Sequence, residues 1–329
     1  MKIRTFSADD TDTVAAVVDL ENAASKVDAP FRHPETLRTY TARMRHGWDG
    51  ETPETYAARD GDGSLVGVIE LSVSEWDNTH VAWADLTVHP DERRRGYGSA
   101  LLQFAEERAR ELGRRSIGCD GWDTASTNGF AARHGLPRRS ASINRRQTLA
   151  AVDPAVLDEM YDEAAAAASS YELIRIAGQT PDDMLDAVAE MTASINDAPT
   201  DDLDIEDEVF PAERIVGYET AQRESGNRLY RVIARHREGG ELAGHSVVAV
   251  EAERPTIGDQ HDTSVSGAHR GHRLGLLLKV DMLRWLAEVE PALETIDTWN
   301  TESNDHMIEV NEKLGYRVLG RGLEFQRDI

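Results

Sequence analysis

The chain has 329 residues and a formal net charge of −24 at pH 7. The length favours two domains of ordinary size over one core, and the acidic balance argues against a general affinity for nucleic acid or an anionic membrane. No apolar run approaches the roughly 18 residues that a membrane-spanning helix needs, and the N-terminus MKIRTFSADD lacks the apolar core of a signal peptide. We therefore expect a cytoplasmic protein. The single cysteine, Cys119, excludes an internal disulfide framework and a cysteine metal cluster, and we expect no metal.

The chain repeats itself. Residues 88–110 read VHPDERRRGYGSALLQFAEERAR and residues 265–279 read VSGAHRGHRLGLLLK. ASKVDAP at 24–30 also matches ASINDAP at 193–199. Around the first pair, identical residues recur at a constant spacing of 177: Leu65/Leu242, Gly67/Gly244, Asp85/Asp262, Arg93/Arg270, Gly98/Gly275 and Trp122/Trp299. So long a period predicts a duplicated domain rather than a solenoid of short repeats.

Each copy is expected to run as a strand, one or two helices, a strand hairpin, a glycine-containing turn, a long helix, a strand, a helix and a closing strand. In the first copy, residues 64–73 and 80–88 are rich in β-forming residues and predict an antiparallel hairpin. Residues 98–112 carry apolar side chains at helical spacing. In the second copy, residues 241–252 and 259–265 predict the strands and residues 274–289 the helix.

Two segments lie outside this plan. Residues 153–171 are rich in alanine and predict a helical connector rather than a flexible linker. Residues 200–210, TDDLDIEDEVF, are acidic and are interpreted as an insertion of the second domain, either an ordered segment or a solvated loop. We therefore expect a first domain at 1–150, a connector at 151–170 and a second domain at 171–329.

The turn after Val88 is suited to binding an anion. A strand that leads through HPDERRRGYG into a helix near Gly98 would direct several unpaired backbone N–H groups at one point. Glycine there lets a phosphate approach the backbone. The pattern differs from the dinucleotide fingerprint and from the Walker loop, since no G-x-G-x-x-G follows a first parallel strand and no G-K-[ST] follows the turn.

The turn and its context resemble the GNAT superfamily of N-acetyltransferases, whose acetyl-CoA signature is [RQ]-x-x-G-x-[GA] after a V-x-P strand end. Val88, Pro90 and the run from Arg93 to Gly98 match it fully. The resemblance covers both copies and implies a tandem GNAT protein of α+β class. Each domain would be an α/β sandwich in which a mixed, mostly antiparallel sheet is flanked by helices.

The resemblance implies that both turns bind acetyl-CoA. In the first copy the implied contacts are Leu86, Val88, Arg93, Arg94, Arg95, Gly96, Tyr97, Gly98 and Ser99. In the second copy they are Val265, Arg270, Gly271, His272, Arg273, Leu274, Gly275 and Asn304. Arg273 stands where the signature has glycine. An arginine is tolerated there if the backbone stays right-handed, and its guanidinium could then grip a phosphate. If the position needs a positive φ or close phosphate approach, the side chain would obstruct it.

The later motif of the second copy is intact. Residues 294–316 match the family, with Asn304 expected to cap a helix whose buried face carries Met307, Val310 and Leu314.

Acetyl transfer to an amine requires a base for the amine, stabilisation of the thioester oxygen and a proton for the leaving thiolate. The resemblance assigns the oxygen to a backbone N–H on a bulged strand, at Val88 or Val265 by position. The candidate bases are Glu70, Asp85 and Asp262, with Glu251 behind the last of these. Because Asp85 and Asp262 are duplicates, they share either a catalytic or a structural role.

The family's usual acid, a tyrosine, is missing. Its position falls near Ala131 in the first copy and on Asn311 in the second, and neither side chain can donate that proton. Proton delivery would then fall to water, to another side chain such as Tyr97 or His306, or to solvent exchange of the thiolate.

Three possibilities remain in view. The first is an N-acetyltransferase that moves the acetyl group of acetyl-CoA to a primary amine of a small molecule or peptide. The second is an acetyl-CoA-binding sensor or scaffold in which one or both domains do not catalyse. A third possibility is a transferase in which the second copy alone is catalytic. In each case the chain is expected as a monomer whose two domains mimic a dimer, or as a homodimer.

Overall fold

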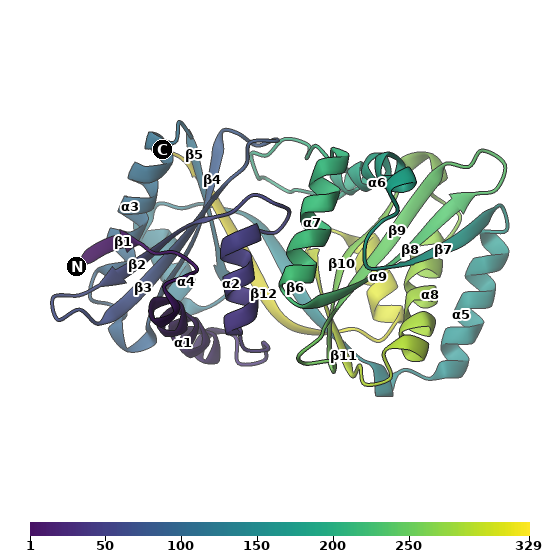
Figure 1. The fold of residues 1–329 in the computed structure, drawn as a ribbon, viewed down its shortest axis with the longest axis horizontal. Helices are drawn as coiled ribbons and strands as arrows, with labels where there is room; N and C mark the ends of the chain where they lie inside the picture. Colours follow the sequence, from purple (N-terminus) through teal and green to yellow (C-terminus); the bar gives the residue numbers. More distant parts are fainter. The chain divides into compact units, whose positions relative to one another are not determined.

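A computed structural model describes residues 1–329 and forms two compact units (Figure 1). Unit 1 consists of Met1–Ser142, Thr200–Asp207 and Gly320–Ile329. Unit 2 consists of Ile143–Pro199 and Glu208–Leu319. The structure contains no helix with the length and apolar character needed to cross a membrane.

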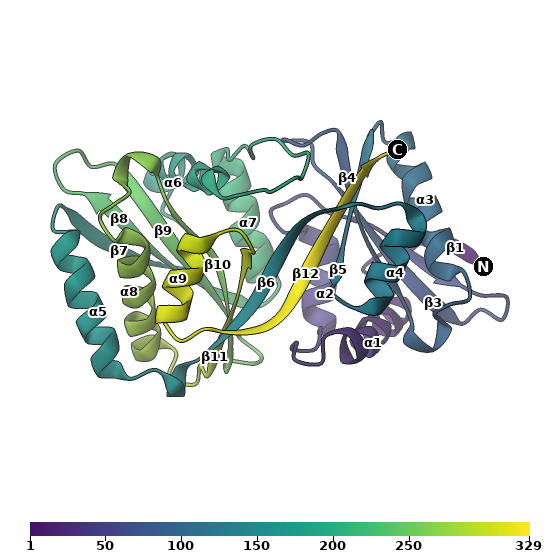
Figure 2. The ribbon, with the colours of Figure 1, turned by 180° about the vertical axis from the view of Figure 1, so that it is seen from behind.

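Unit 1 is built on one mixed sheet with the strand order β1-β2-β3-β4-β5-β12. All neighbouring pairs are antiparallel except β4 and β5, which are parallel. The strands are β1 (Lys2–Thr5), β2 (Glu54–Arg59), β3 (Leu65–Val73), β4 (Val81–Val88), β5 (Ser116–Trp122) and the end of β12 (Arg317–Asp328). The helices are α1 (Thr11–Asp28), α2 (Leu37–His46), α3 (Tyr97–Glu111) and α4 (Ala125–His134), with a 3₁₀ turn η1 (Pro90–Glu92). Helices α1 and α2 cover one face of the sheet and α3 and α4 the other (Figures 1 and 2).

Unit 2 repeats this plan with the strand order β7-β8-β9-β10-β11-β6. Its parallel pair is β10 with β11, and β7, β8, β9 and β10 pair antiparallel. The strands are β7 (Tyr171–Ala177), β8 (Asn227–His236), β9 (Leu242–Glu251), β10 (Ile257–Val265), β11 (Thr295–Thr301) and the end of β6 (Arg138–Thr148). The helices are α5 (Pro154–Ala167), α6 (Leu185–Thr192), α7 (Ala212–Glu224), α8 (Leu274–Val289) and α9 (Asp305–Lys313). Short 3₁₀ turns complete the chain: η2 (Leu149–Ala151), η3 (Asp182–Met184), η4 (Ala193–Asp197) and η5 (Gly267–His269).

The predicted fold class is confirmed, because each unit is a mixed, mostly antiparallel sheet between two layers of helices. The predicted hairpins are β3–β4 and β9–β10, and the long helices after the two turns are α3 and α8. Asn304 caps α9 as predicted, since its side chain accepts a hydrogen bond from the Met307 N–H at 3.2 Å. Val310 on this helix and Leu314 at its C-cap are buried as predicted, whereas Met307 is only half-buried.

The units do not follow the expected linear division near residue 150. The C-terminal strand β12 pairs with β5 of unit 1 through seven consecutive residues, from Gly322 to Asp328. Strand β6, from the first half of the chain, lies beside β11 in unit 2. Each unit therefore takes its closing strand from the other half of the chain.

The two segments outside the repeat also differ in part from expectation. The connector is helical as predicted, and α5 packs Ala164 into the core of unit 2. The acidic segment was assigned to the second domain, whereas Thr200–Asp207 belongs to unit 1. Its backbone is held there by Asn78, which bonds Glu206, and by Gln326, which bonds Asp204.

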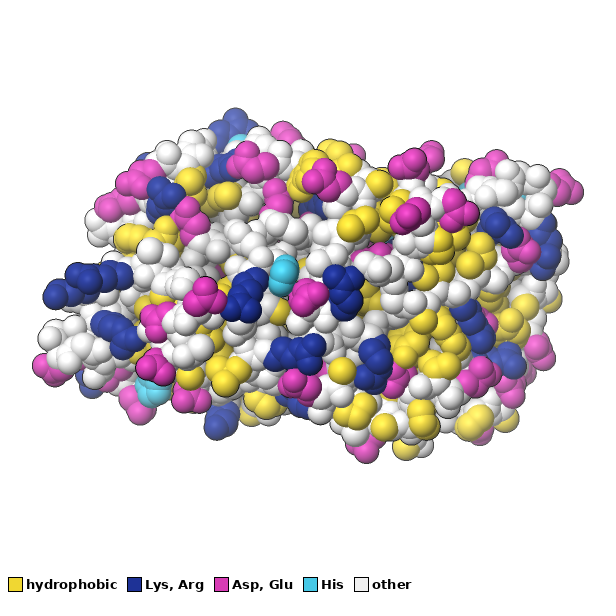
Figure 3. Space-filling view, in the orientation of Figure 1, with side chains coloured by type: hydrophobic (Ala, Val, Ile, Leu, Met, Phe, Trp, Pro, Cys, Tyr) yellow, Lys and Arg dark blue, Asp and Glu magenta, His cyan; other side chains and the backbone are white.

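The excess acidic side chains are dispersed rather than gathered into one patch on the face shown in Figure 3. Asp and Glu are interspersed there with Lys or Arg and with apolar side chains. Such a mixed surface favours solubility.

Strand β12 should contribute to the stability of unit 1, although it is the last strand of the chain. Phe325 lies opposite Cys119 on β5 and is 5% exposed, whereas Val318 on the same strand is 61% exposed. We expect Phe325→Ala to cost about 3–5 kcal/mol of unfolding free energy and Val318→Ala less than about 0.5 kcal/mol. Hydrogen exchange should show the loss of protection in β5 for Phe325→Ala. Lost protection confined to β8 and β9 would contradict this assignment.

Candidate functional site

The two signature turns have the same backbone. Each follows a 3₁₀ turn and contains two residues with positive φ, at equivalent positions. In unit 1 these are Arg94 (φ 67°) and Gly96 (φ 89°), and in unit 2 they are Gly271 (φ 87°) and Arg273 (φ 54°). The arginine and the glycine have exchanged places between the copies. The loss of the central glycine is therefore matched by a glycine two residues earlier.

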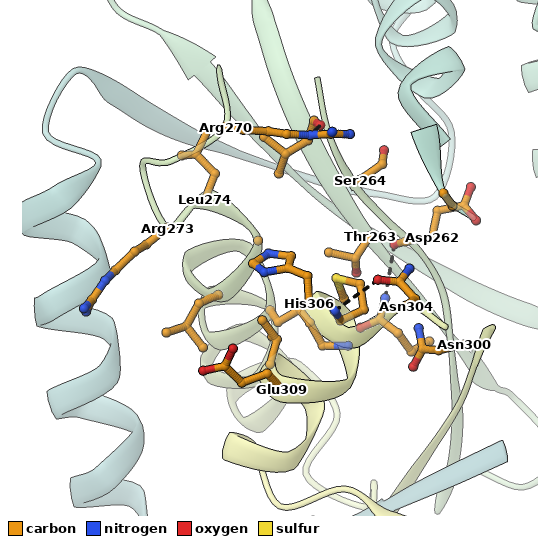
Figure 4. Close-up of a pocket in the computed structure, with 18 of the residues that line it drawn as sticks. Asp262, Thr263, Ser264, Arg270, Arg273, Leu274, Asn300, Asn304, His306 and Glu309 are labelled. Atoms are coloured by element: carbon orange, nitrogen blue, oxygen red, sulfur yellow. Dashed lines mark hydrogen bonds between the residues drawn. The ribbon is translucent and has the colours of Figure 1, made fainter. Parts of the chain in front are cut away.

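Arg273 adopts the left-handed conformation but does not obstruct the turn. Its guanidinium donates a hydrogen bond to Glu163 on α5 at 2.8 Å, and both side chains are more than half exposed. Figure 4 shows Arg273 pointing toward α5 rather than across the turn. The expectation of a phosphate-gripping guanidinium assumed a right-handed backbone, and that assumption is wrong.

The first signature arginine anchors the turn in both copies. In unit 1, Arg93 makes two hydrogen bonds to the Asp28 carboxylate, at 2.6 and 2.8 Å, and donates to the Val88 carbonyl at 3.2 Å. In unit 2, Arg270 donates to Asp197 at 2.7 Å and to the Val265 carbonyl at 3.3 Å. The two aspartates are duplicates within the DAP motif. The repeated motif held the signal for this pair, which we had not assigned.

Other residues that were expected to contact acetyl-CoA contact protein atoms in this structure. Arg95 pairs with Glu92 at 2.7 Å, the Ser99 hydroxyl lies 2.9 Å from His134 Nε2, and Leu274 is 2% exposed in the core of unit 2. Leu86, Val88 and Tyr97 pack against the core of unit 1.

The parallel strand pair separates in both units. Strands β4 and β5 pair only over Val81–Trp83, and β10 and β11 only over Ile257–Gln260. Beyond these points the strands no longer share hydrogen bonds, which opens a gap in the sheet beside the signature turn.

Only one of the two central strands is bulged. The register of β10 against β9 shifts between Gln260 and Thr263, so His261 and Asp262 form a bulge, whereas β4 pairs with β3 without a shift. The bulge expected at Val265 lies a few residues earlier, and the one expected at Val88 is absent. A bulge places neighbouring side chains on the same side of a strand. Accordingly, Tyr218 of α7 bonds His261 at 2.5 Å and also interacts electrostatically with Asp262.

A cavity of about 1090 Å³ lies at the gap in unit 2 (Figure 4). Its wall combines the signature turn and the start of α8, the ends of β10 and β11, one face of α9, and parts of α5 and η4. The residues used below are Asp262, Thr263, Ser264, Val265, Gly271, Gly275, Leu276, Lys279, Asn300, Asn304 and His306. Figure 4 shows His306 extending into its middle, beside Thr263 and Asn304.

Comparisons with known proteins identify the family. The sequence model described as the acetyltransferase (GNAT) family matches residues 18–135. A mycothiol acetyltransferase of Parafrankia sp. is 26% identical over 97% of this chain and 96% of its own, and that of Geodermatophilus obscurus is 35% identical over 43% of each chain. A solved tandem GNAT protein from the clavulanic acid biosynthesis pathway is 27% identical, with a TM-score of 0.81 over 99% of this chain and 98% of that one. Residues 18–135 thus match the GNAT family, and the chain as a whole is similar to tandem GNAT proteins. It is accordingly an acetyl-CoA-dependent acyltransferase.

The GNAT turn of unit 2 has room for the diphosphate of acetyl-CoA. A Cβ added to Gly271 or Gly275 would meet no atom within 4 Å, so both positions face open space. Helix α8 begins at this turn, and its unpaired N–H groups favour an anion. The cavity is also slightly larger than the roughly 300–1,000 Å³ of typical ligand sites. These residues fit the cosubstrate.

The corresponding place in unit 1 is more filled. A Cβ on Gly98 would lie 3.1 Å from the ring of Phe130, a residue of α4, and 3.8 Å from Val88. Phe130 in turn stacks against His134, which meets Ser99. Helix α4 thus packs closely on the start of α3.

Asp262 is the candidate base with the most suitable surroundings. It lines the cavity at the bulge, and burial raises the pKa of its carboxyl, an effect that Arg231 partly offsets. Burial also lowers the pKa of His261 to about 4, which keeps this neighbour neutral at pH 7. Glu251 is removed from consideration, because its carboxylate makes two hydrogen bonds to Arg254, at 2.6 and 2.9 Å.

In unit 1, the candidate bases belong to a cluster of carboxylates. Glu70 lies opposite Asp85 on the neighbouring strand and receives two hydrogen bonds from Arg43, at 3.0 and 3.2 Å. Burial, followed by the charges of Asp120, Glu21 and Glu70, raises the pKa of Asp85 well above its ordinary range. Burial and the charge of Glu70 likewise raise the pKa of Glu21 to about 7. One arginine does not neutralise this group.

Neither position expected for the family's tyrosine faces the cavity with a proton donor. Ala131 is buried in the core of unit 1. Asn311 is fully buried and donates to the Asn300 side chain at 2.6 Å. No tyrosine lines the unit 2 cavity. We found no group of three or more His, Cys, Asp and Glu side chains arranged to hold a metal ion.

The left-handed conformation of Arg273 leads to a test of its role. Arg273→Gly should change the unfolding free energy by less than about 1 kcal/mol, because relief of the backbone strain offsets the loss of a surface ion pair. Isothermal titration should give an acetyl-CoA affinity within about threefold of wild type, with Glu163→Gln as the matched control for the ion pair. A tenfold loss of affinity for Arg273→Gly alone would show that the guanidinium does bind phosphate.

The raised pKa of Glu21 predicts a pH-dependent stability. Between its ordinary value of 4.5 and about 7, the folded state holds the proton that the unfolded chain releases. Glu21 therefore destabilises the fold increasingly as the pH rises through this window. In urea unfolding, Glu21→Gln should gain stability relative to wild type from pH 4.5 to pH 7 and keep a constant advantage above it. The exposed Glu190→Gln on α6 is the control, and a gain that is equal at all pH values would refute this account.

Proposed function

We propose that unit 2 transfers the acetyl group of acetyl-CoA to a primary amine, with Asp262 as the base. The observation that carries this proposal is the coincidence, in one unit, of the β10 bulge, the gap between β10 and β11 and the cavity of about 1090 Å³. The family model matches unit 1 by sequence, but unit 1 has an unshifted β4 and a Phe130 ring against its turn.

Each wall of the cavity has a proposed task. The N-terminus of α8 and the backbone of the turn hold the diphosphate. The edge of β10 that faces β11 is unpaired over Thr263–Val265, and its N–H groups stabilise the thioester oxygen as negative charge develops there. Asn304, the N-cap of α9, lies on the wall that α9 contributes to the cavity.

Asp262 acts on the amine from the α7 side of the sheet. A carboxylate whose pKa is raised by burial is a better base than an exposed one, because its affinity for a proton is closer to that needed at neutral pH. Deprotonated Asp262 takes a proton from the acceptor ammonium, and the neutral amine then attacks the thioester carbon. The rate is therefore expected to rise with pH through the pKa of Asp262.

We propose that the acceptor is a small molecule. The names of the relatives refer to mycothiol and to clavulanic acid biosynthesis, and neither name refers to a protein acceptor. The net charge of −24 favours the approach of a cationic amine.

Unit 1 is proposed as a binding or scaffolding copy. Its turn keeps the same pair of positive-φ residues and the same Arg–Asp anchor as unit 2. Without a bulge in β4 and with a carboxylate cluster in place of a single base, it lacks the arrangement assigned to catalysis in unit 2.

The duplicated aspartates provide a matched test. Asp262→Asn should lower kcat by about 10²–10⁴, the range typical of a lost general base, and should leave acetyl-CoA affinity nearly unchanged in isothermal titration. Asp85→Asn is the same substitution at the equivalent position of unit 1 and is expected to change kcat far less. Thiol release from acetyl-CoA is measured across a panel of primary amines. If Asp85→Asn abolishes turnover while Asp262→Asn retains it, catalysis belongs to unit 1.

A further inference from the structure

Lys279 is a buried amine on the wall of the unit 2 cavity. It lies on α8 and is 2% exposed, yet it lines the cavity. Gly275 and Leu276 also line it, and residues three and four positions apart share a face of a helix. Lys279 therefore continues the cavity-facing stripe of α8, about 6 Å farther along the helix from the signature turn than Gly275.

The amine has no carboxylate partner. Its nitrogen lies 4.9 Å from the centre of the Tyr316 ring, and no hydrogen bond or ion pair joins it to another side chain. The charged and titratable groups that line the cavity are Glu159 and Glu163 on α5, Asp197 on η4, His261 and Asp262 on β10, His269, Arg270 and Arg273 at the turn, and His306, Glu309 and Lys313 on α9. Asp297 on β11 acts on the Tyr316 hydroxyl from outside this lining. Several of these are paired elsewhere: Glu163 with Arg273, Asp197 with Arg270, Asp297 with Arg146, and Glu309 with Lys313.

The position of Lys279 is close to the place where the family has its tyrosine acid, which this chain lacks. The Tyr316 ring beneath its amine belongs to a residue whose N–H bonds the Asn311 carbonyl at 3.0 Å, and Asn311 occupies the position of the family's acid. The Lys279 amine, which α8 carries, thus lies on the same side of the cavity as the α9 position of the family's acid. In unit 1 the equivalent residue is Leu102, which is 2% exposed in the core. An apolar residue suits that core position, so packing does not explain the lysine.

We infer that Lys279 is the proton donor to the thiolate that leaves acetyl-CoA. This inference rests on the proposed function of unit 2. As the amine nitrogen bonds to the acetyl carbon, the carbon–sulfur bond breaks and its electron pair stays on sulfur. The Lys279 ammonium gives that sulfur a proton and becomes a neutral amine, which recovers a proton from those released by the acceptor.

The proton affinity of Lys279 suits this step. Burial lowers the pKa of its ammonium to about 7, so the proton is more readily given up than that of an ordinary lysine. A thiol has an ordinary pKa of about 8.5, which makes transfer from the ammonium to the thiolate favourable. The other cavity lysine, Lys313, is half-exposed and pairs with Glu309 at 2.6 Å. His306 lies on the exposed first turn of α9.

The experiment uses coenzyme A itself, so that no acceptor needs to be known. If the Lys279 ammonium faces the sulfur, it stabilises the thiolate and lowers the pKa of the bound thiol. The thiolate is followed by its ultraviolet absorbance as the pH is raised, as a difference against the complex with desulfo-coenzyme A. The protein's own thiol, Cys119, does not interfere, because burial raises its pKa to about 12.

Below about pH 7, where Lys279 is charged, wild type is expected to hold about tenfold more thiolate in bound coenzyme A than free coenzyme A holds at the same pH, which corresponds to a thiol pKa lowered by about one unit while the ammonium is present. Lys279→Met should return the thiol to its value in free coenzyme A, while the matched Lys313→Met should retain the shift. On the amine panel, Lys279→Met should also lower kcat by about 10² or more. Equal thiol pKa values for wild type and Lys279→Met, or loss of the shift in His306→Gln instead, would overturn the inference.

A separate variant tests the proposed function itself. Gly275→Phe places a ring in the open space of the cavity and should abolish coenzyme A binding to unit 2. If this variant binds coenzyme A as wild type does, the cosubstrate does not use this cavity, and the proposed function and the inference both fall. If binding is lost in Gly275→Phe but the thiol is unshifted in wild type, only the role of Lys279 is refuted.

Discussion

The separation of the parallel strands is the constraint on which the rest of the site depends. Strands β10 and β11 stop sharing hydrogen bonds after Gln260 and Thr298, and buried backbone groups that lose a partner must find another. In unit 2 the backbone groups beyond this point face the cavity and not another strand. The bulge at His261 and Asp262 lies at the point of separation, so the same irregularity opens the sheet and turns a carboxylate toward α7.

The position of the signature turn depends on an ion pair with an aspartate that lies earlier in the sequence. Arg270 joins the strand end at Val265 to Asp197 of η4, and Arg93 does the same for Val88 and Asp28. The first signature arginine, present in both copies, thus fixes the position of the turn, and in the proposed function the backbone N–H groups bind the phosphate. This explains why arginine and glycine could exchange places within the turn while both copies kept its conformation.

Much of the fold could be predicted because the sequence contains the same domain pattern twice. The spacing of 177 aligned Asp85 with Asp262 and both turns, and local patterns then gave the hairpins and helices. What escaped prediction depends on long-range geometry. No local pattern marks β12 as a strand of unit 1, and a one-residue shift against β9 is invisible in DQHDTSV. The sequence shows Lys279 only as one polar residue in an apolar helix, and only the packed structure shows that this side chain is buried and lines a cavity.

The exchange of closing strands gives a physical reason for the chain to keep unit 1, which we propose to be non-catalytic. Unit 1 places Leu323 and Phe325 of the C-terminal strand in its core, and unit 2 uses β6 from the first half of the chain. A sheet without its closing strand exposes an unpaired edge, which invites aggregation. Each half of the chain therefore needs the other for a complete fold. Under that requirement the residues at the gap of unit 1, such as Phe130 and the Asp85 cluster, can diverge from catalysis, while its scaffold cannot be dispensed with.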